Sequence, residues 1–152
     1  MSNPPATPDE LDALEQTIDS WLATELETNP ILVDVTRADD VPRRWYVRLV
    51  GEEKDFTTIW LTLGQRTLKY ETYVLPFPEE NHREVYELLL RQNYRLVGAQ
   101  FGIGPEDGLF LSGELPTQAV DSEELDRIVG SIYAYVERFF GSVVRLAFAS
   151  RF

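Results

Sequence analysis

The chain has 152 residues, of which 43% are apolar, 12% are aromatic and none is cysteine. This composition allows one hydrophobic core and excludes a disordered chain, a disulfide framework and a thiol nucleophile. The net charge of -12 argues against nucleic acid and anionic membranes as partners, and no apolar run approaches the ~18 residues of a membrane span.

The first thirty residues contain acidic residues but neither Lys nor Arg, so we expect no signal or transit peptide and a cytoplasmic protein. Residues 1–7 are polar and contain proline, which predicts a flexible tail. Residues 8–152 are expected to form a single domain, because no linker or repeat interrupts them.

A helix is predicted to begin at Pro8, because Thr7 can cap it and Glu10 completes a capping box. It is expected to end at Asn29-Pro30, since the residue before proline disfavours the helical region. The predicted buried stripe contains Leu11, Leu14, Ile18, Trp21 and Leu22.

Alternation of apolar and polar residues then predicts four strands. These strands are Ile31–Thr36, Trp45–Val50, Phe56–Leu63 and Thr67–Leu75. Charged or glycine-containing turns separate them, so we expect an antiparallel meander with one core face and one more polar face. Consecutive apolar residues at 59–61 suggest that the third strand is central or covered on both sides.

The second half is predicted to contain a short helix, a hairpin and a long helix. Asn81 and Glu84 are expected to cap the short helix. The turn-forming segment 104–108 joins two alternating stretches and predicts the hairpin. Asp121 precedes the longest helical stripe in the chain, which Gly141 is expected to end.

Residues 142–152 alternate again and could form a strand or an apolar arm. Together the elements predict an α+β fold in the order helix, antiparallel strands, helix, two strands, long helix.

No catalytic, cofactor-binding or metal-ligating residues are predicted, and no cofactor is expected. His82, the single histidine, lies at a helix start, where a polar surface position is the favoured interpretation. The segment Gly102–Gly108 superficially resembles a dinucleotide-binding loop, but its third glycine is one place late and a strand follows it.

Five aromatic residues on the predicted strands could form a stacking platform, but such platforms have basic surroundings that this acidic chain lacks. We therefore expect core packing for most of them. These residues are Trp45, Tyr46, Trp60, Tyr70 and Tyr73. Arg43 and Arg44 are interpreted as a solvated strand entrance.

Four segments resemble the YbjN family, whose members are described as bacterial sensory transduction regulators. They are Phe56–Pro78, Glu79–Arg91, Phe101–Asp107 and Val120–Ile128. The resemblance covers about residues 21–140, looks closest to actinobacterial members and carries over no active-site residue.

The resemblance implies the fold of type III secretion chaperones, which are small acidic homodimers that bind extended segments of client proteins. That fold has a helix, three antiparallel strands, a helix, two strands and a last helix. The strand predicted at Ile31–Thr36 and the tail after Gly141 have no counterpart in this pattern.

A homodimer is expected, because the short helix is apolar over more than half of its circumference and needs a second packing partner. The resemblance implies the same helix as the dimer contact. The candidate interface residues are Val85, Tyr86, Leu89 and Leu90. The alternative is that residues 142–152 wrap this helix within one chain.

The sequence favours a non-catalytic protein-interaction or regulatory module, chaperone-like, that binds a partner or client segment. The alternative is a small-ligand sensor or enzyme, with a pocket between sheet and helices and His82 or a tyrosine as its polar group. A domain that only stabilises an assembly is a third possibility. Buried ionisable groups in a pocket would favour the sensor or enzyme, and an apolar surface patch would favour the interaction module.

Overall fold

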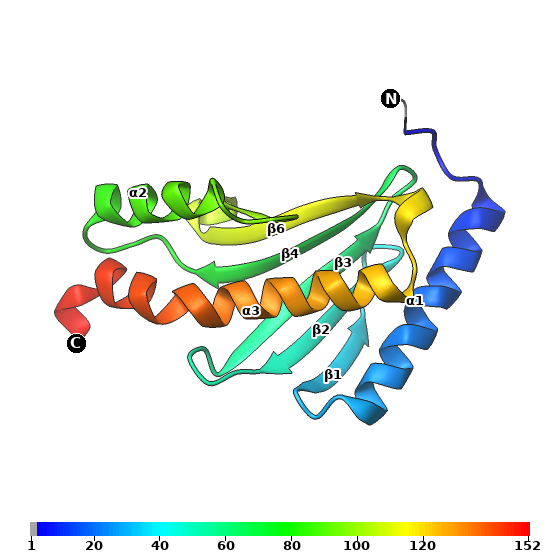
Figure 1. The fold of residues 1–152 in the computed structure, drawn as a ribbon, viewed down its shortest axis with the longest axis horizontal. Coiled ribbons are helices and arrows are strands. Elements are labelled where there is room, and N and C mark those ends of the chain that lie inside the picture. The colour runs from blue at the N-terminus through cyan, green and yellow to red at the C-terminus, as the bar shows by residue number, and fades with distance from the viewer. Residues whose placement is uncertain (1–2) are drawn as a thin grey trace.

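The computed structural model describes residues 3–152 and contains, within them, three α-helices and six strands (Figure 1). The helices are α1 (Pro8–Thr28), α2 (His82–Asn93) and α3 (Ser122–Ala147). The strands are β1 (Leu32–Arg37), β2 (Arg44–Val50), β3 (Phe56–Leu63), β4 (Thr67–Leu75), β5 (Gln100–Ile103) and β6 (Leu109–Pro116). They form one antiparallel sheet in the order β1-β2-β3-β4-β6-β5.

The predicted element order and the α+β class are confirmed. All four strands of the predicted meander are present, and the hairpin β5–β6 turns through the short 3₁₀ segment Pro105–Asp107. The capping box of α1 is also present, with Thr7 accepting from the backbone of Glu10 and Glu10 accepting from that of Thr7.

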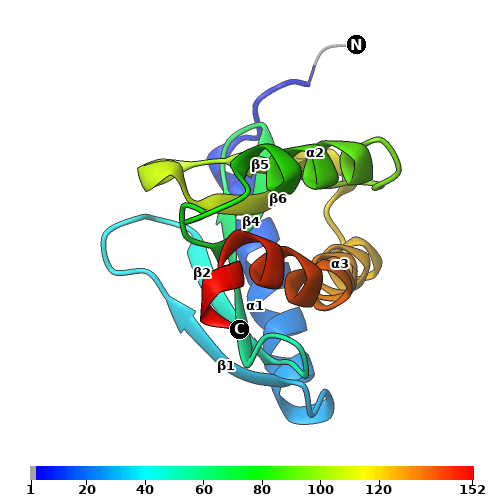
Figure 2. The same ribbon diagram turned by 90° about the vertical axis from the view of Figure 1, so that its left-hand side faces the viewer.

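The helices pack against one face of the sheet, so the core lies between that face and the helices (Figure 2). Alternate residues of each strand point into it, which is why Trp45, Ile59 and Leu111 are fully buried. Trp45 also ties α1 to the sheet, because its indole nitrogen donates to Asp19 at 2.7 Å.

The prediction that Gly141 ends the long helix is wrong. α3 continues to Ala147, and a 3₁₀ turn follows at Ala149–Arg151, so residues 142–152 form neither a strand nor an extended arm. The buried stripe continues through Val143 and Ala147, and this burial favours continued helix. Gly141 instead faces the β2–β3 loop, where an added Cβ would lie 2.8 Å from the Glu53 carboxylate.

The capping role predicted for Asn81 is also wrong. Asn81 is the N-cap residue of α2, but it has a left-handed backbone and its side chain makes no cap hydrogen bond. It donates instead to the carbonyl of Leu146, and the amides of Glu79 and Glu80 donate to the carbonyl of Ala147. The end of α3 therefore holds the beginning of α2.

The flexible tail expected at residues 1–7 lies partly outside the described residues. In the described part, the amide of Ala6 donates to Gln65 at 2.7 Å and the side chain of Asn3 donates to Arg66 at 2.8 Å. Across residues 3–152, every helix is too short or too polar to cross a membrane.

Candidate functional site

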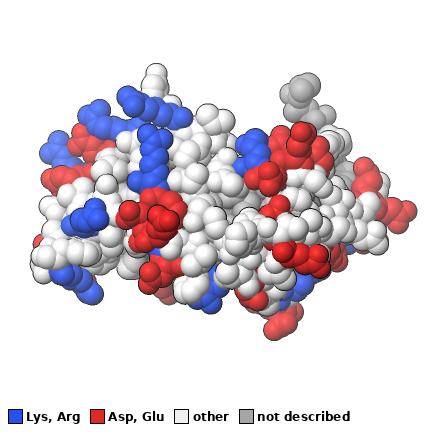
Figure 3. Space-filling view, turned by 60° about the horizontal axis from the view of Figure 1, so that its bottom comes forward, with Lys and Arg blue, Asp and Glu red and all other residues white. Residues whose placement is uncertain are grey.

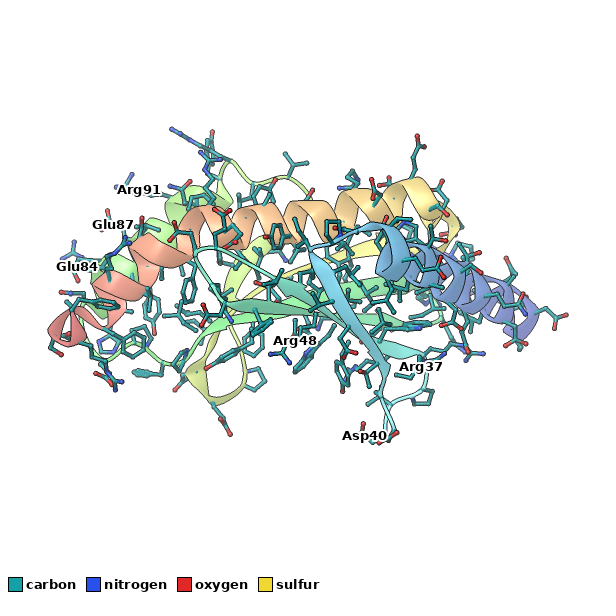
Figure 4. All side chains as sticks on the ribbon, turned by 90° about the horizontal axis from the view of Figure 1, so that it is seen from below. Arg37, Asp40, Arg48, Glu84, Glu87 and Arg91 are labelled. Atoms are coloured by element: carbon teal, nitrogen blue, oxygen red, sulfur yellow. The ribbon has the colours of Figure 1, made fainter. Side chains whose placement is uncertain are left out.

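The helices leave the opposite face of the sheet uncovered, and we call it the open face. Strand register defines its members, because Tyr46 pairs with Trp60 and Tyr73 pairs with Phe110. Figure 4 shows Arg48 on the side of the sheet away from the helices. The aromatic and arginine residues of the open face are Arg44, Tyr46, Arg48, Phe56, Trp60, Tyr73 and Phe110.

Aromatic rings and arginines pack against one another on this face. Tyr46 and Trp60 meet edge to face, with ring centroids 5.9 Å apart. The Arg44 guanidinium lies 5.6 Å from the Trp60 ring, and its Nε donates to Thr62 at 2.9 Å. Arg48 lies 3.8 Å from the Phe56 ring. Such contacts orient the guanidinium groups without removing them from water.

A second aromatic pair extends the open face toward β6. Tyr73 and Phe110 meet edge to face, with centroids 5.4 Å apart, and Tyr73 is 41% exposed. Desolvation, and to a smaller extent the charge of Glu106, raise the pKa of Tyr73, so its hydroxyl stays protonated at neutral pH. The open face therefore offers apolar ring surface together with hydrogen-bond donors.

The prediction that most of the five strand aromatics pack in the core is wrong, because only Trp45 and Tyr70 of the five are buried there. Tyr46, Trp60 and Tyr73 lie on the open face instead. A sequence signal was available, since Arg44 and Arg48 alternate in register with Tyr46, and arginines are rarely placed in a core.

The four candidate interface residues divide into two pairs. Val85 and Leu89 are buried in this chain's own core, at 0% and 4% exposure. Tyr86 is half-buried and Leu90 is 67% exposed. With Ile103 of the edge strand β5, these two form a surface that we call the α2 patch.

A pocket of about 360 Å³ opens within the α2 patch. No acidic, basic or histidine side chain lines it, and its amide, Asn93, is occupied by two hydrogen bonds with the backbone of Phe101. The pocket is lined by Tyr86, Leu89, Leu90, Asn93, Phe101, Gly102, Ile103 and Leu109. It is suited to an apolar side chain rather than to acid-base chemistry.

His82 is half-buried rather than a free surface residue. Its Nε2 donates to the carbonyl of Pro78 at 2.6 Å, and its ring lies 4.8 Å from that of Phe77 and 6.3 Å from that of Tyr86. A backbone carbonyl can only accept, so this nitrogen carries the proton. These contacts give the ring a structural role at the entrance to α2.

Arg43 is not a solvated strand entrance either, because it pairs with Asp12 at 2.9 Å and Glu15 at 3.0 Å on α1. Among residues 3–152, no group of three or more acidic or histidine side chains is arranged to hold a metal ion.

Comparison of the chain with known proteins places it in a family. Residues 12–144 match the model of the YbjN family, described as "Putative bacterial sensory transduction regulator", and the chain belongs to this family. An uncharacterized protein of Mycobacterium tuberculosis is 32% identical over 114 residues, and one of Mycobacterium leprae is 33% identical over 107 residues. These matches cover 75% and 70% of this chain but only 62% and 58% of the relatives, so the chain spans about three fifths of their length.

Solved structures show the same fold. A chain of the HopA1-SchA chaperone-effector complex superposes with a TM-score of 0.58 at 13% identity, covering 91% of this chain and 99% of that one. A chain of the ExsC-ExsE complex gives 0.57 at 14% identity, with 88% and 96% covered. The fold is thus that of type III secretion chaperones, as predicted.

Proposed function

We propose that this chain is a non-catalytic protein-interaction module that binds a segment of a partner protein on its open face. The observation that carries the proposal is that all three helices cover one face of the sheet and leave aromatic rings on the other. The chaperone-effector complex among the structural neighbours supports a protein as the partner.

The chemistry of the pockets favours this function over a ligand sensor or an enzyme. A sensor or catalyst would need positioned polar or ionisable groups in its pocket. The pocket of the α2 patch is lined by no acidic, basic or histidine side chain, its Asn93 amide is engaged by the backbone of Phe101, and His82 is engaged by the carbonyl of Pro78.

The open face can bind a segment by burying apolar side chains against Tyr46 and Trp60, while Arg44 and Arg48 donate to its carbonyl or carboxylate oxygens. Aromatic and arginine residues contribute most of the affinity in many protein interfaces. Because their rings and guanidinium groups already pack together, little side-chain freedom remains to be lost on binding.

We expect Trp60→Ala to abolish the recovery of partner proteins that tagged wild-type protein retains from cell extract. Tyr94→Ala is the matched control, since Tyr94 is 94% exposed and lies at the end of α2, away from the open face. Bound proteins are quantified by mass spectrometry. Equal recovery by wild type and Trp60→Ala would contradict the proposed site.

We further propose a homodimer formed through the α2 patch, in which Leu90 of each copy enters the apolar pocket of the other. An isologous contact allows this exchange, because one surface carries both the protruding side chain and the pocket. The charges also favour it, since residues 82–104 contain three arginines and two glutamates, a net of +1 in a chain of net -12. Figure 3 shows blue atoms, with red atoms among them, toward the left end, where α2 and the end of α3 lie.

Light scattering at micromolar concentration is expected to give twice 17.5 kDa for the wild type and 17.5 kDa for Leu90→Asp. Leu26→Asp is the matched control on α1, where Leu26 is 46% exposed, and should remain dimeric. Added salt should strengthen the wild-type dimer by screening the net charge. A wild-type mass of 17.5 kDa at both low and moderate salt would refute the dimer.

A further inference from the structure

A small pocket lies between the end of α1 and the first half of α3. Its volume is about 210 Å³, and its apolar wall includes Trp21, Leu49 and Val129, which are all buried. Two carboxylates line it, those of Glu25 and Asp126, and no basic residue does. Within residues 3–152 neither carboxylate forms an ion pair, and Glu25 accepts one hydrogen bond from the Asn29 amide.

Gly130 lines the same pocket, and packing does not explain it. Glycine is among the least favourable residues inside a helix, and Gly130 lies in the interior of α3. A Cβ added there would meet no atom within 4 Å, so alanine would fit. The glycine leaves space in the wall of the pocket.

The end of α1 shows a second departure from helix stability. The last turn contains Glu25 and Glu27 and no basic residue, although the negative end of the helix dipole favours cations. Residues that are unfavourable for the local helix are commonly found where function requires them. Here two such features, Gly130 in α3 and the acidic last turn of α1, meet at one pocket.

We propose that this pocket receives a lysine or arginine side chain from a basic, amphipathic segment of a partner protein. The carboxylates complement the cation. The apolar part of the segment packs on neighbouring side chains, since Leu26 is 46% exposed and Ile31, which lines the pocket, is 37% exposed. This inference rests on the proposed role as a protein-interaction module but uses a different surface.

The test is a titration of ¹⁵N-labelled protein with a synthetic peptide of repeated Leu-Lys-Lys-Leu, followed by amide chemical shifts. Shifts are expected at residues 25–31 and 126–133. Replacing every Lys of the peptide by Glu should abolish them. Spermidine, which is cationic but lacks apolar side chains, should not produce them at equal concentration; saturation by spermidine would overturn the assignment to a protein segment.

Matched variants distinguish peptide binding at the pocket from general attraction of the basic peptide to the negatively charged chain. Glu25→Gln with Asp126→Asn should weaken peptide binding about five- to tenfold, because each exposed ion pair contributes modestly. Asp39→Asn with Asp40→Asn changes the net charge equally in the exposed β1–β2 loop and should leave the affinity unchanged. Equal weakening by both pairs would overturn the proposal.

Gly130→Leu should fill the pocket and prevent the shifts at residues 126–133, while raising the melting temperature because leucine favours helix. Trp60→Ala should bind the peptide as the wild type does. If the peptide does not bind while partner recovery still depends on Trp60, the pocket assignment fails and the open-face function stands.

Discussion

Trp45→Ala is expected to lower the free energy of unfolding by about 3–5 kcal/mol, the range for truncating a large buried aromatic residue. Trp45 is fully buried between the sheet and α1, and its indole nitrogen donates to Asp19. The Arg37 guanidinium lies 4.6 Å from its ring and pairs with Asp19 at 3.5 Å. The substitution therefore leaves a cavity and also releases α1 from the sheet.

Trp60→Ala is the matched control, because the two tryptophans lie on adjacent strands but on opposite faces. Trp60 is half-buried, so its removal should cost about 1 kcal/mol. Urea denaturation followed by circular dichroism measures both values. Similar losses for the two variants would show that the open face is covered. If Trp45→Ala does not fold, Trp45→Phe should still show a measurable loss and a weaker attachment of α1.

Glu137→Ala is expected to lower the free energy of unfolding by about 2–3 kcal/mol and to loosen the β2–β3 loop. The Glu137 carboxylate, on α3, accepts hydrogen bonds from the backbone amides of Glu52, Glu53 and Lys54. Alanine would remove the acceptor for all three. The loss of stability stays within this range because the loop is partly exposed to water, which can replace the lost acceptor.

Hydrogen exchange at those three amides, together with denaturation, tests this expectation. Exchange should accelerate in Glu137→Ala and only partly in Glu137→Gln, which keeps one acceptor oxygen. Gly51→Ala should also accelerate exchange at these amides, because the added Cβ would approach the Lys54 carbonyl to 2.2 Å. Unchanged amide protection in Glu137→Ala would show that the loop is held by other contacts.

The periodicity of the sequence predicted the order of the helices and strands, but it did not predict which face of the sheet the helices cover. Along β3, the set Thr57, Ile59, Leu61 is buried and the set Phe56, Thr58, Trp60 lies on the open face. Both sets contain strong strand formers, so alternation alone could not rank them. Each set also contains a threonine, Thr57 in the buried one and Thr58 in the other, so side-chain polarity did not distinguish them either.

Helical periodicity had the same limit on α2. Val85, Leu89 and Leu90 are equally apolar, yet two of them complete this chain's core and only Leu90 projects outward. The distinction depends on how α2 meets β5 and α3, which are distant in sequence. The pocket beside Gly130 depends likewise on where α1 meets α3. The glycine was visible in the sequence, but its neighbours were not.

The strand order has a consequence for the order of folding. β1 to β4 pair through short connections, whereas β4 and β6 pair across the intervening segment 76–108. Local pairings close small loops and form early, so we expect the meander to form before β6 joins it. α3 contacts β3, β4 and β6, and it can dock fully only on the completed sheet. Substitutions on α3, such as Glu137→Ala, should therefore act mainly by accelerating unfolding and leave the rate of folding almost unchanged.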